Sequence, residues 1–168
     1  SDGTPAGTVL VKDIQPGKFG ANPRYLTNVN GTLYFSANER TNGYELWKSD
    51  GTDAGTVLVK DISVGTGGSH PTKLTNVNGT LFFKADDSVS RGKLWKSDGT
   101  AAGTILVGDV YAIGSLVNVN GTLFFSENDS LNRGVIWKSD GTTAGTVPLQ
   151  NLGPGPDFTS FKSLTNVN

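Results

Sequence analysis

Short apolar segments alternate with turn-forming residues along the whole chain. The first complete unit has four segments rich in β-branched and aromatic residues, at 26–30, 32–37, 44–50 and 56–62. Successive side chains of a strand point to opposite faces, so Leu33 and Phe35 share one face of the second segment and Tyr34 takes the other. Both faces are therefore apolar. No 3.6-residue apolar period appears, and the pattern predicts strands without helices.

Three landmarks repeat at a common step. Asp-Gly-Thr begins at positions 2, 50, 98 and 140, Trp recurs at 47, 95 and 137, and Val-Asn begins at 29, 77, 119 and 167. The segment Leu-Trp-Lys-Ser-Asp-Gly-Thr at 46–52 returns unchanged at 94–100, and with Ile in place of Leu at 136–142. Self-similarity at a fixed period indicates a repeat architecture.

Turn residues set the direction of the strands. The first two segments of each unit are joined by Asn-Gly, which favours the two positive φ values of a type I′ hairpin turn. This dipeptide stands at 30–31, 78–79 and 120–121. The Asp-Gly-Thr link between the third and fourth segments is equally tight. Four antiparallel strands in a unit of this length have the size of one β-propeller blade, whereas a parallel solenoid would not place a hairpin in every repeat.

The motif at 45–52, Glu-Leu-Trp-Lys-Ser-Asp-Gly-Thr, resembles the bacterial ELWxxDGT repeat family of large secreted or surface-associated proteins of mostly undefined function. The resemblance covers essentially the whole chain. The third copy departs from the motif, because it reads Gly-Val-Ile-Trp at 134–137 and its unit is six residues shorter. More distantly, 46–50 followed by 54–59 is similar to the blade pattern of quinoprotein-type propellers.

That second resemblance implies the frame of the array. We expect an all-β β-propeller segment with three complete four-stranded blades and an unpaired strand at each end. The single repeat array, 1–168, then divides into an outer strand at 8–14, blades at 26–62, 74–110 and 116–152, and an inner strand at 164–168. We expect the chain to be a segment of a longer array. The strands missing from the incomplete blade would come from the same longer chain or from a neighbouring subunit, which would allow a multimer or fibre.

The loops fall into two groups in this frame. The Asn-Gly and Asp-Gly-Thr turns share one rim, and the links that vary in length and composition share the other, which we call the variable rim. Recognition is usually placed on loops held by a rigid scaffold. The candidate ligand-binding residues on the variable rim are Phe19, Arg24, Tyr25, Arg40, His70, Lys73, Asp86, Asp87, Asp129 and Arg133. The alternative is that these residues are ordinary solvated loop residues.

The repeated residues favour structural roles. A tryptophan in every unit, in mid-strand beside Leu or Ile, is typical of packing between blades, although exposed aromatic rings could also stack on sugars. The expected core residues are Trp47, Trp95, Trp137, Leu33, Phe35, Leu81, Phe83, Leu123 and Phe125. The pairs at 86–87 and 128–129 could offer oxygens to Ca²⁺, but they lack the EF-hand spacing, and turn capping is the alternative. We expect no cofactor and no other metal.

Composition narrows the function classes. Fourteen Lys and Arg against 15 Asp and Glu give a net charge of −1, without the basic surface of a nucleic-acid binder. The absence of Cys and the single His exclude thiolate nucleophiles and the common triads. No segment is apolar enough to span a membrane. We expect a non-enzymatic extracellular or cell-surface module, a structural or adhesive scaffold that contacts further repeats, glycans or surface proteins. The alternative is a lectin with sites between blades on the variable rim.

Overall fold

The computed structural model describes residues 1–108, 110, 113–128, 134–151 and 164. These residues form twelve strands and no helix, so the prediction of an all-β chain is confirmed. The strands are β1 Arg24–Val29, β2 Thr32–Glu39, β3 Gly43–Ser49, β4 Val57–Lys60, β5 Thr72–Val77, β6 Thr80–Ala85, β7 Lys93–Ser97, β8 Ile105–Gly108, β9 Ile113–Val119, β10 Thr122–Asn128, β11 Gly134–Ser139 and β12 Val147–Asn151. No described helix is long and apolar enough to cross a membrane.

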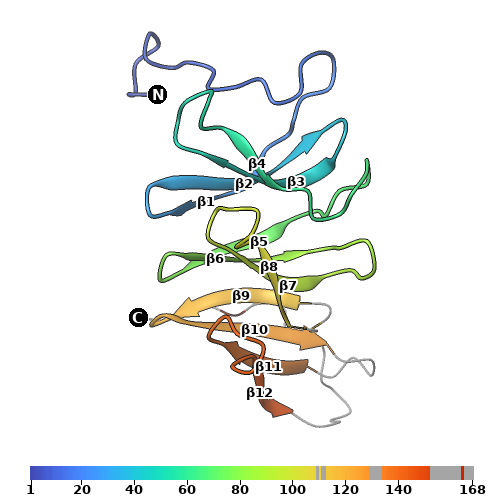
Figure 1. Ribbon diagram of the computed structural model, residues 1–168. Coiled ribbons are helices and arrows are strands. Elements are labelled where there is room, and N and C mark those ends of the chain that lie inside the picture. Colours follow the sequence, from blue (N-terminus) through green and yellow to red (C-terminus); the bar gives the residue numbers. More distant parts are fainter. Residues whose placement is uncertain (109, 111–112, 129–133, 152–163, 165–168) are drawn as a thin grey trace.

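The strands form three four-stranded antiparallel sheets, as expected. The first sheet has the order β1-β2-β3-β4, the second β5-β6-β7-β8 and the third β9-β10-β11-β12. Figure 1 shows the sheets stacked one on another, each made from a continuous stretch of the chain. Strands of neighbouring sheets approach most closely at β1 and β5, and at β5 and β9.

The two expected end strands have different outcomes. Residues 8–14 belong to none of the twelve strands, because no neighbouring strand lies beside them to form a ladder. Of the expected strand at 164–168, only Leu164 is among the described residues.

The hairpin turns adopt the predicted backbone. Asn30 and Gly31 have φ values of 51° and 83°, and the turns at 78–79 and 120–121 repeat these values within a few degrees. In the first turn, the Asn28 Oδ1 also accepts the N–H of Gly31 at 2.9 Å. The type I′ prediction from Asn-Gly is confirmed, because both central residues take the positive φ that this turn requires.

The hydrophobic core lies between the sheets. Tyr34, Leu46 and Val59 of the first sheet pack in one cluster with Phe83 and Trp95 of the second. The equivalent residues of the second sheet pack in another cluster with Phe125, and Trp137 lies against it. Phe83 and Phe125 are fully buried, and each contributes about 1.5–3 kcal/mol to folding. The second sheet therefore buries one face on the first sheet and the other on the third.

A row of asparagine side chains joins the first strands of neighbouring sheets. The Asn76 Nδ2 donates to the Asn28 carbonyl at 3.1 Å, and the Asn118 Nδ2 donates to the Asn76 carbonyl at 2.9 Å. The Oδ1 of Asn76 accepts the N–H of Gly79 at 2.9 Å within its own hairpin turn. One side chain thus closes its own turn and ties its sheet to the preceding one.

We expect Asn76→Ala to lower the free energy of unfolding by about 1–2 kcal/mol, because an exposed and a partly buried hydrogen bond are lost. Urea unfolding followed by tryptophan fluorescence measures the change. The matched control is Asn38→Ala, since the Asn38 side chain has no hydrogen bond to any described residue. Equal losses in the two variants would contradict the role of the asparagine row.

Candidate functional site

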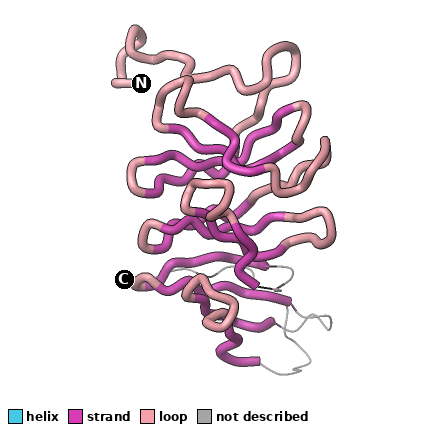
Figure 2. The backbone as a smooth tube through the Cα atoms, in the orientation of Figure 1, coloured by secondary structure: helices cyan, strands magenta, loops and turns pink. Residues whose placement is uncertain are grey.

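The loops lie on two sides of the stack, as the frame requires. Figure 2 shows the Asn-Gly turns on one side and the β2–β3 and β6–β7 loops on the other. The second side is the variable rim. Three hollows lie there, with volumes of about 350, 220 and 350 Å³.

The middle hollow, of about 220 Å³, is the most chemically distinctive. Arg24, Tyr25, Tyr44 and His70 line it, and we call these four residues the rim cluster. The rings of Tyr44 and His70 have centroids 5.7 Å apart, and the Arg24 guanidinium lies 6.0 Å from the Tyr44 centroid. The Tyr44 hydroxyl accepts a hydrogen bond from the Asn22 Nδ2 at 3.0 Å. Tyr25 is 48% exposed and offers its ring to solvent.

A repeated backbone conformation projects these side chains. Asn22 and His70 both precede a proline and have φ values of 47° and 49°. Three residues further on, Tyr25 and Lys73 have φ values of 58° and 55°, where the ladders of β1 and β5 shift register. Positive φ in a non-glycine residue often marks a functional site, but here it recurs at equivalent positions of two sheets. The conformation therefore belongs to the repeat, and only the side chains differ.

Two glycines let the loop before β5 approach β3. Tyr44 forms an isolated bridge with Gly68, and its carbonyl accepts the N–H of His70 at 3.0 Å. A Cβ on Gly68 would overlap the backbone of Tyr44, and one on Gly43 would overlap the loop. This close approach places His70 beside Tyr44.

Beneath the rim cluster lies a buried carboxylate that the sequence analysis did not single out. Glu45 is fully buried and accepts the N–H groups of Ile62 and Ser63, both at 3.2 Å. It also accepts the N–H of Ser69 at 2.8 Å and a short hydrogen bond from the Ser69 hydroxyl. Burial raises the pKa of Glu45 to about 7, although these hydrogen bonds oppose the shift. The carboxylate therefore holds both ends of the loop that carries His70.

The two aspartates at 86–87 on the variable rim accept hydrogen bonds from the loop that carries them. The Asp86 Oδ1 accepts the N–H of Gly92 at 2.7 Å, and the Asp87 Oδ1 accepts those of Val89 and Ser90 at 2.8 and 2.6 Å. Both aspartates line a hollow of about 350 Å³ that reaches the other side of His70. Within the described ranges, no group of three or more His, Cys, Asp or Glu side chains could hold a metal ion. The geometry is that of turn capping.

The remaining predicted rim residues are dispersed. Phe19 and Arg40 line the third hollow, at the N-terminal end of the stack. Lys73 is exposed and lines none of the three hollows. Asp129 and Arg133 lie outside the described residues. The structure thus brings together Arg24, Tyr25 and His70, and it adds Tyr44.

Trp95 and Trp137 lie between sheets, and Trp47 lies on the outer face of the first sheet beside Ile14. Trp47 and Trp95 are only 6% and 8% exposed, and the Trp137 ring stacks on Phe125 with centroids 6.0 Å apart. The Lys60 ammonium lies 5.9 Å from the Trp95 centroid. These rings are covered by neighbouring residues, so they are not open platforms for a sugar.

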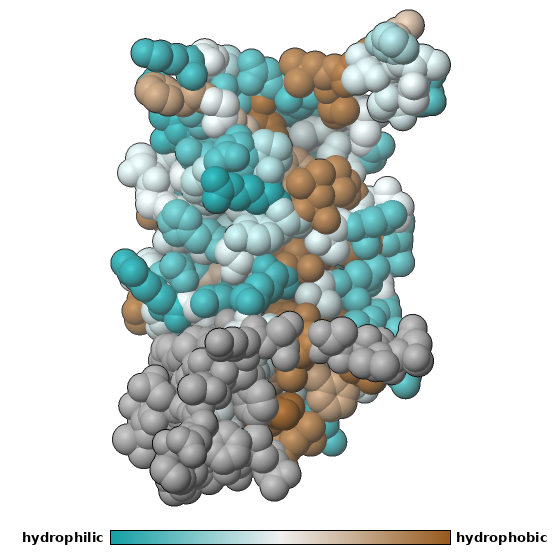
Figure 3. Space-filling model, turned by 180° about the vertical axis from the view of Figure 1, so that it is seen from behind, coloured by the Kyte–Doolittle hydropathy of each residue, from teal (hydrophilic) through white to brown (hydrophobic). Residues whose placement is uncertain are grey.

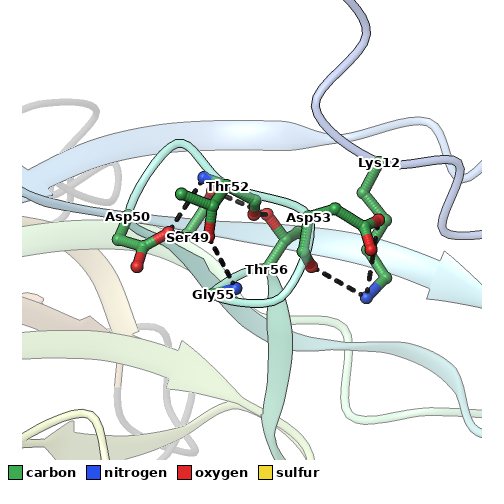
Figure 4. A network of polar contacts seen from close by, with 7 residues as sticks. All are labelled: Lys12, Ser49, Asp50, Thr52, Asp53, Gly55 and Thr56. Atoms are coloured by element: carbon green, nitrogen blue, oxygen red, sulfur yellow. Dashed lines mark hydrogen bonds and ion pairs between the residues drawn. The ribbon is translucent and has the colours of Figure 1, made fainter.

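The repeated Asp-Gly-Thr loops are closed by internal hydrogen bonds. In Figure 4, the Asp50 Oδ1 accepts the N–H and the hydroxyl of Thr52, at 2.9 and 2.7 Å, and the Thr52 Oγ1 accepts the N–H of Gly55. Exposed aspartates in these loops have a pKa below the usual value, because each accepts such bonds from a threonine. The same pattern recurs at 2–7, 98–103 and 140–145.

The lysine after the first tryptophan links two sheets. The Lys48 Nζ donates to the carbonyl of Gly99, in the Asp-Gly-Thr loop of the second sheet, at 2.8 Å. Lys60, at the end of β4, donates to the Thr104 carbonyl of the same loop at 2.8 Å. From the sequence, Lys48, Lys96 and Lys138 are expected to be solvated strand residues, and this expectation is wrong for Lys48. Its repetition in mid-strand was the available signal.

Comparisons with known proteins give no match: no family model, no curated protein and no solved structure is similar to this chain. The resemblance to the ELWxxDGT repeats therefore depends on the motif alone.

The buried carboxylate predicts a pH-dependent stability. The folded chain holds a proton on Glu45 up to about pH 7, whereas the unfolded chain releases it near 4.5. The free energy of unfolding should therefore fall by about 3 kcal/mol as pH rises from about 4.5 to about 7, and then level off. Urea unfolding across this range should show the fall in the native protein and not in Glu45→Gln.

Glu39→Gln is the matched control, because Glu39 lies at the end of β2 and is only partly buried. It should keep the pH dependence of the native protein. Parallel curves for the native protein and Glu45→Gln would contradict the assignment.

Proposed function

We propose that this chain is a non-enzymatic repeat module, a β-propeller segment that acts as a structural or adhesive scaffold at or outside a bacterial cell surface. The observation that carries the proposal is the set of hydrogen bonds made by the repeated polar side chains. The asparagines, aspartates and lysines that recur in the motif bond to turns and to neighbouring sheets. The polar side chains that recur in the repeats therefore stabilise the turns and the stack of sheets.

The spacing of the sheets supports a propeller. Neighbouring sheets come closest at their first strands, β1, β5 and β9. Sheets that converge at their first strands and diverge toward their fourth have the arrangement of blades around an axis. In this arrangement β1, β5 and β9 are the inner strands. The rim cluster lies on the variable rim, near the first residues of β1 and β5.

Composition supports a location outside the cell. The chain has no Cys and no Met, the two residue types most sensitive to oxidation. Its near-zero net charge gives no electrostatic reason for contact with nucleic acid. The partners we propose are further repeats and, at the variable rim, glycans or surface proteins.

Mutations can test whether the repeated residues stabilise the fold while the residues of the variable rim do not. Lys48→Ala should lower the free energy of unfolding by about 1.5–3 kcal/mol, because a charged hydrogen bond between sheets is lost. Tyr25→Ser should change it by no more than about 0.5 kcal/mol, because the Tyr25 side chain is largely on the surface. Chemical unfolding of both variants gives the comparison. A larger loss for Tyr25→Ser than for Lys48→Ala would contradict the proposed division.

The rim cluster supports the alternative function, a lectin. The close approach of Arg24, Tyr44 and His70 beside the exposed Tyr25 offers aromatic rings together with hydrogen-bond donors, the groups that bind sugars. A glycan array is the test. The scaffold proposal expects only weak contact with glycans that does not saturate for any one class of sugar. Saturable binding to one class of sugar, lost in Tyr25→Ala and retained in Ile105→Ala, an exposed position on β8 that lines neither hollow beside His70, would replace it with the lectin.

A further inference from the structure

The N-terminal segment carries a fourth strand without a sheet. Residues 1–14 and 49–62 are identical except that Pro5 replaces Asp53. The loops agree as well, since the Gly7 N–H bonds to the Thr4 Oγ1 at 2.9 Å as the Gly55 N–H bonds to the Thr52 Oγ1. The later segment continues into β4 and completes the first sheet. The earlier one continues into 8–14 and has no strand beside it.

The segment 8–14 lies over the outer face of the first sheet. Ile14 packs with Phe35 and Trp47 of that sheet, much as Ile62 packs with Trp95 of the next. Between the segment and the sheet lies a hollow of about 350 Å³. Its lining is mainly apolar and includes Leu10, Val11, Ile14, Leu26, Leu33 and Phe35. The outer face of the first sheet can therefore accommodate another apolar sheet face, because residues 8–14 cover it only along one edge.

Exposed apolar side chains surround this partly covered face. Val9, Leu10 and Leu26 are 69%, 80% and 62% exposed, which is unusual for adjacent aliphatic residues of a monomer. Figure 3 shows brown, apolar atoms among hydrophilic ones at the N-terminal end of the stack.

The third sheet presents the complementary face at the other end. Val119, Phe124 and Ile136 are only partly buried. They stand where the first sheet has Val29, Tyr34 and Leu46, which are 5%, 5% and 0% exposed because the second sheet covers them. The two ends of the stack are therefore the two halves of the interface that already joins neighbouring sheets inside the chain.

The outer strand of the third sheet differs from its equivalents at one paired position. Trp137 pairs with Pro148, whereas Trp47 pairs with Leu58 and Trp95 with Leu106. Proline has no N–H for the ladder and is confined to the edges of sheets. Leu10 of the segment 8–14 stands where β4 has Leu58, so this segment places a residue with an N–H where β12 has Pro148.

We propose that a second copy of the chain binds head to tail, with its third sheet seated on the first sheet of its neighbour. Residues 8–14 of the neighbour replace β12 as the fourth strand beside β11. The replacement follows because both segments claim the same place beside β11, and the segment 8–14 has no proline opposite Trp137. The contact is heterologous, so repetition closes a ring or extends a fibre. This inference rests on the stacked-repeat part of the proposed function.

Polar groups at both ends fit the same contact. The Asn28 Nδ2 begins the asparagine row and has no acceptor among the described residues. Lys138 is exposed and occupies the position of Lys48. In the docked pair it reaches the carbonyl of Gly51, the equivalent of the Gly99 carbonyl that Lys48 bonds within the chain.

Sedimentation velocity across a wide range of protein concentration tests the association. The native chain should form dimers or larger species, and Leu10→Lys should weaken the association by roughly tenfold or more, since a buried leucine is lost. Val89→Lys is the matched control, because Val89 is 90% exposed on the β6–β7 loop. It should associate as the native chain does. A native chain that stays monomeric, or equal association of the two variants, overturns the proposal.

Disulfide trapping tests the exchange of strands, and the chain has no cysteine of its own. Lys48 pairs with Val57 in the first sheet, so Val9 of one copy should pair with Lys138 of another. A mixture of Val9→Cys and Lys138→Cys chains should oxidise mainly to the mixed dimer. Association without this mixed dimer overturns the exchange. A monomeric native chain that Lys48→Ala still destabilises would overturn this inference and leave the scaffold proposal standing.

Discussion

Each sheet of this protein has two apolar faces, and the rest of the structure follows from the need to cover both. Phe82 points to one face of β6 and Phe83 to the other, and they are buried in different clusters. A four-stranded sheet standing alone would leave one of these faces in water, at a cost of about 25 cal/mol for each Å² exposed. A repeat with this pattern is therefore stable only between neighbours. The sheets must therefore stack for the chain to fold, whatever function the chain has.

The repeated polar residues serve the same condition. An apolar interface fixes the separation of two sheets but not their register, because hydrophobic contact has no direction. The asparagine row sets the register, since the Asn76 amide reaches one carbonyl of the preceding sheet and one N–H of its own turn. Lys48 and Lys60 do the same near the Asp-Gly-Thr loops. Their repetition therefore reflects geometry, and the side chains free to differ are those of the variable rim.

The features predictable from sequence are those that depend on nearby residues. The Asn-Gly turns, the alternation of Leu33, Tyr34 and Phe35, and the antiparallel order need only local rules. The pairing of Tyr44 with His70 depends on a loop that returns over β3, and residues 26 positions apart give no local sign of it. The signal available was a substitution, since Tyr44 and Glu45 stand where the second copy has Gly92 and Lys93.

A repeat whose two faces are complementary must also control where stacking stops. Edges and end faces in natural sheets are usually protected by charges, prolines or covering segments. Both protections occur here in weak form: Ile14 and Ala21 cover part of one end, and Pro148 lies in the outer strand of the other. The cover leaves a hollow, and the proline removes one N–H from its strand without blocking the face behind it. Faces covered this incompletely fit the head-to-tail contact proposed above, because a unit that fits the internal interface also fits them.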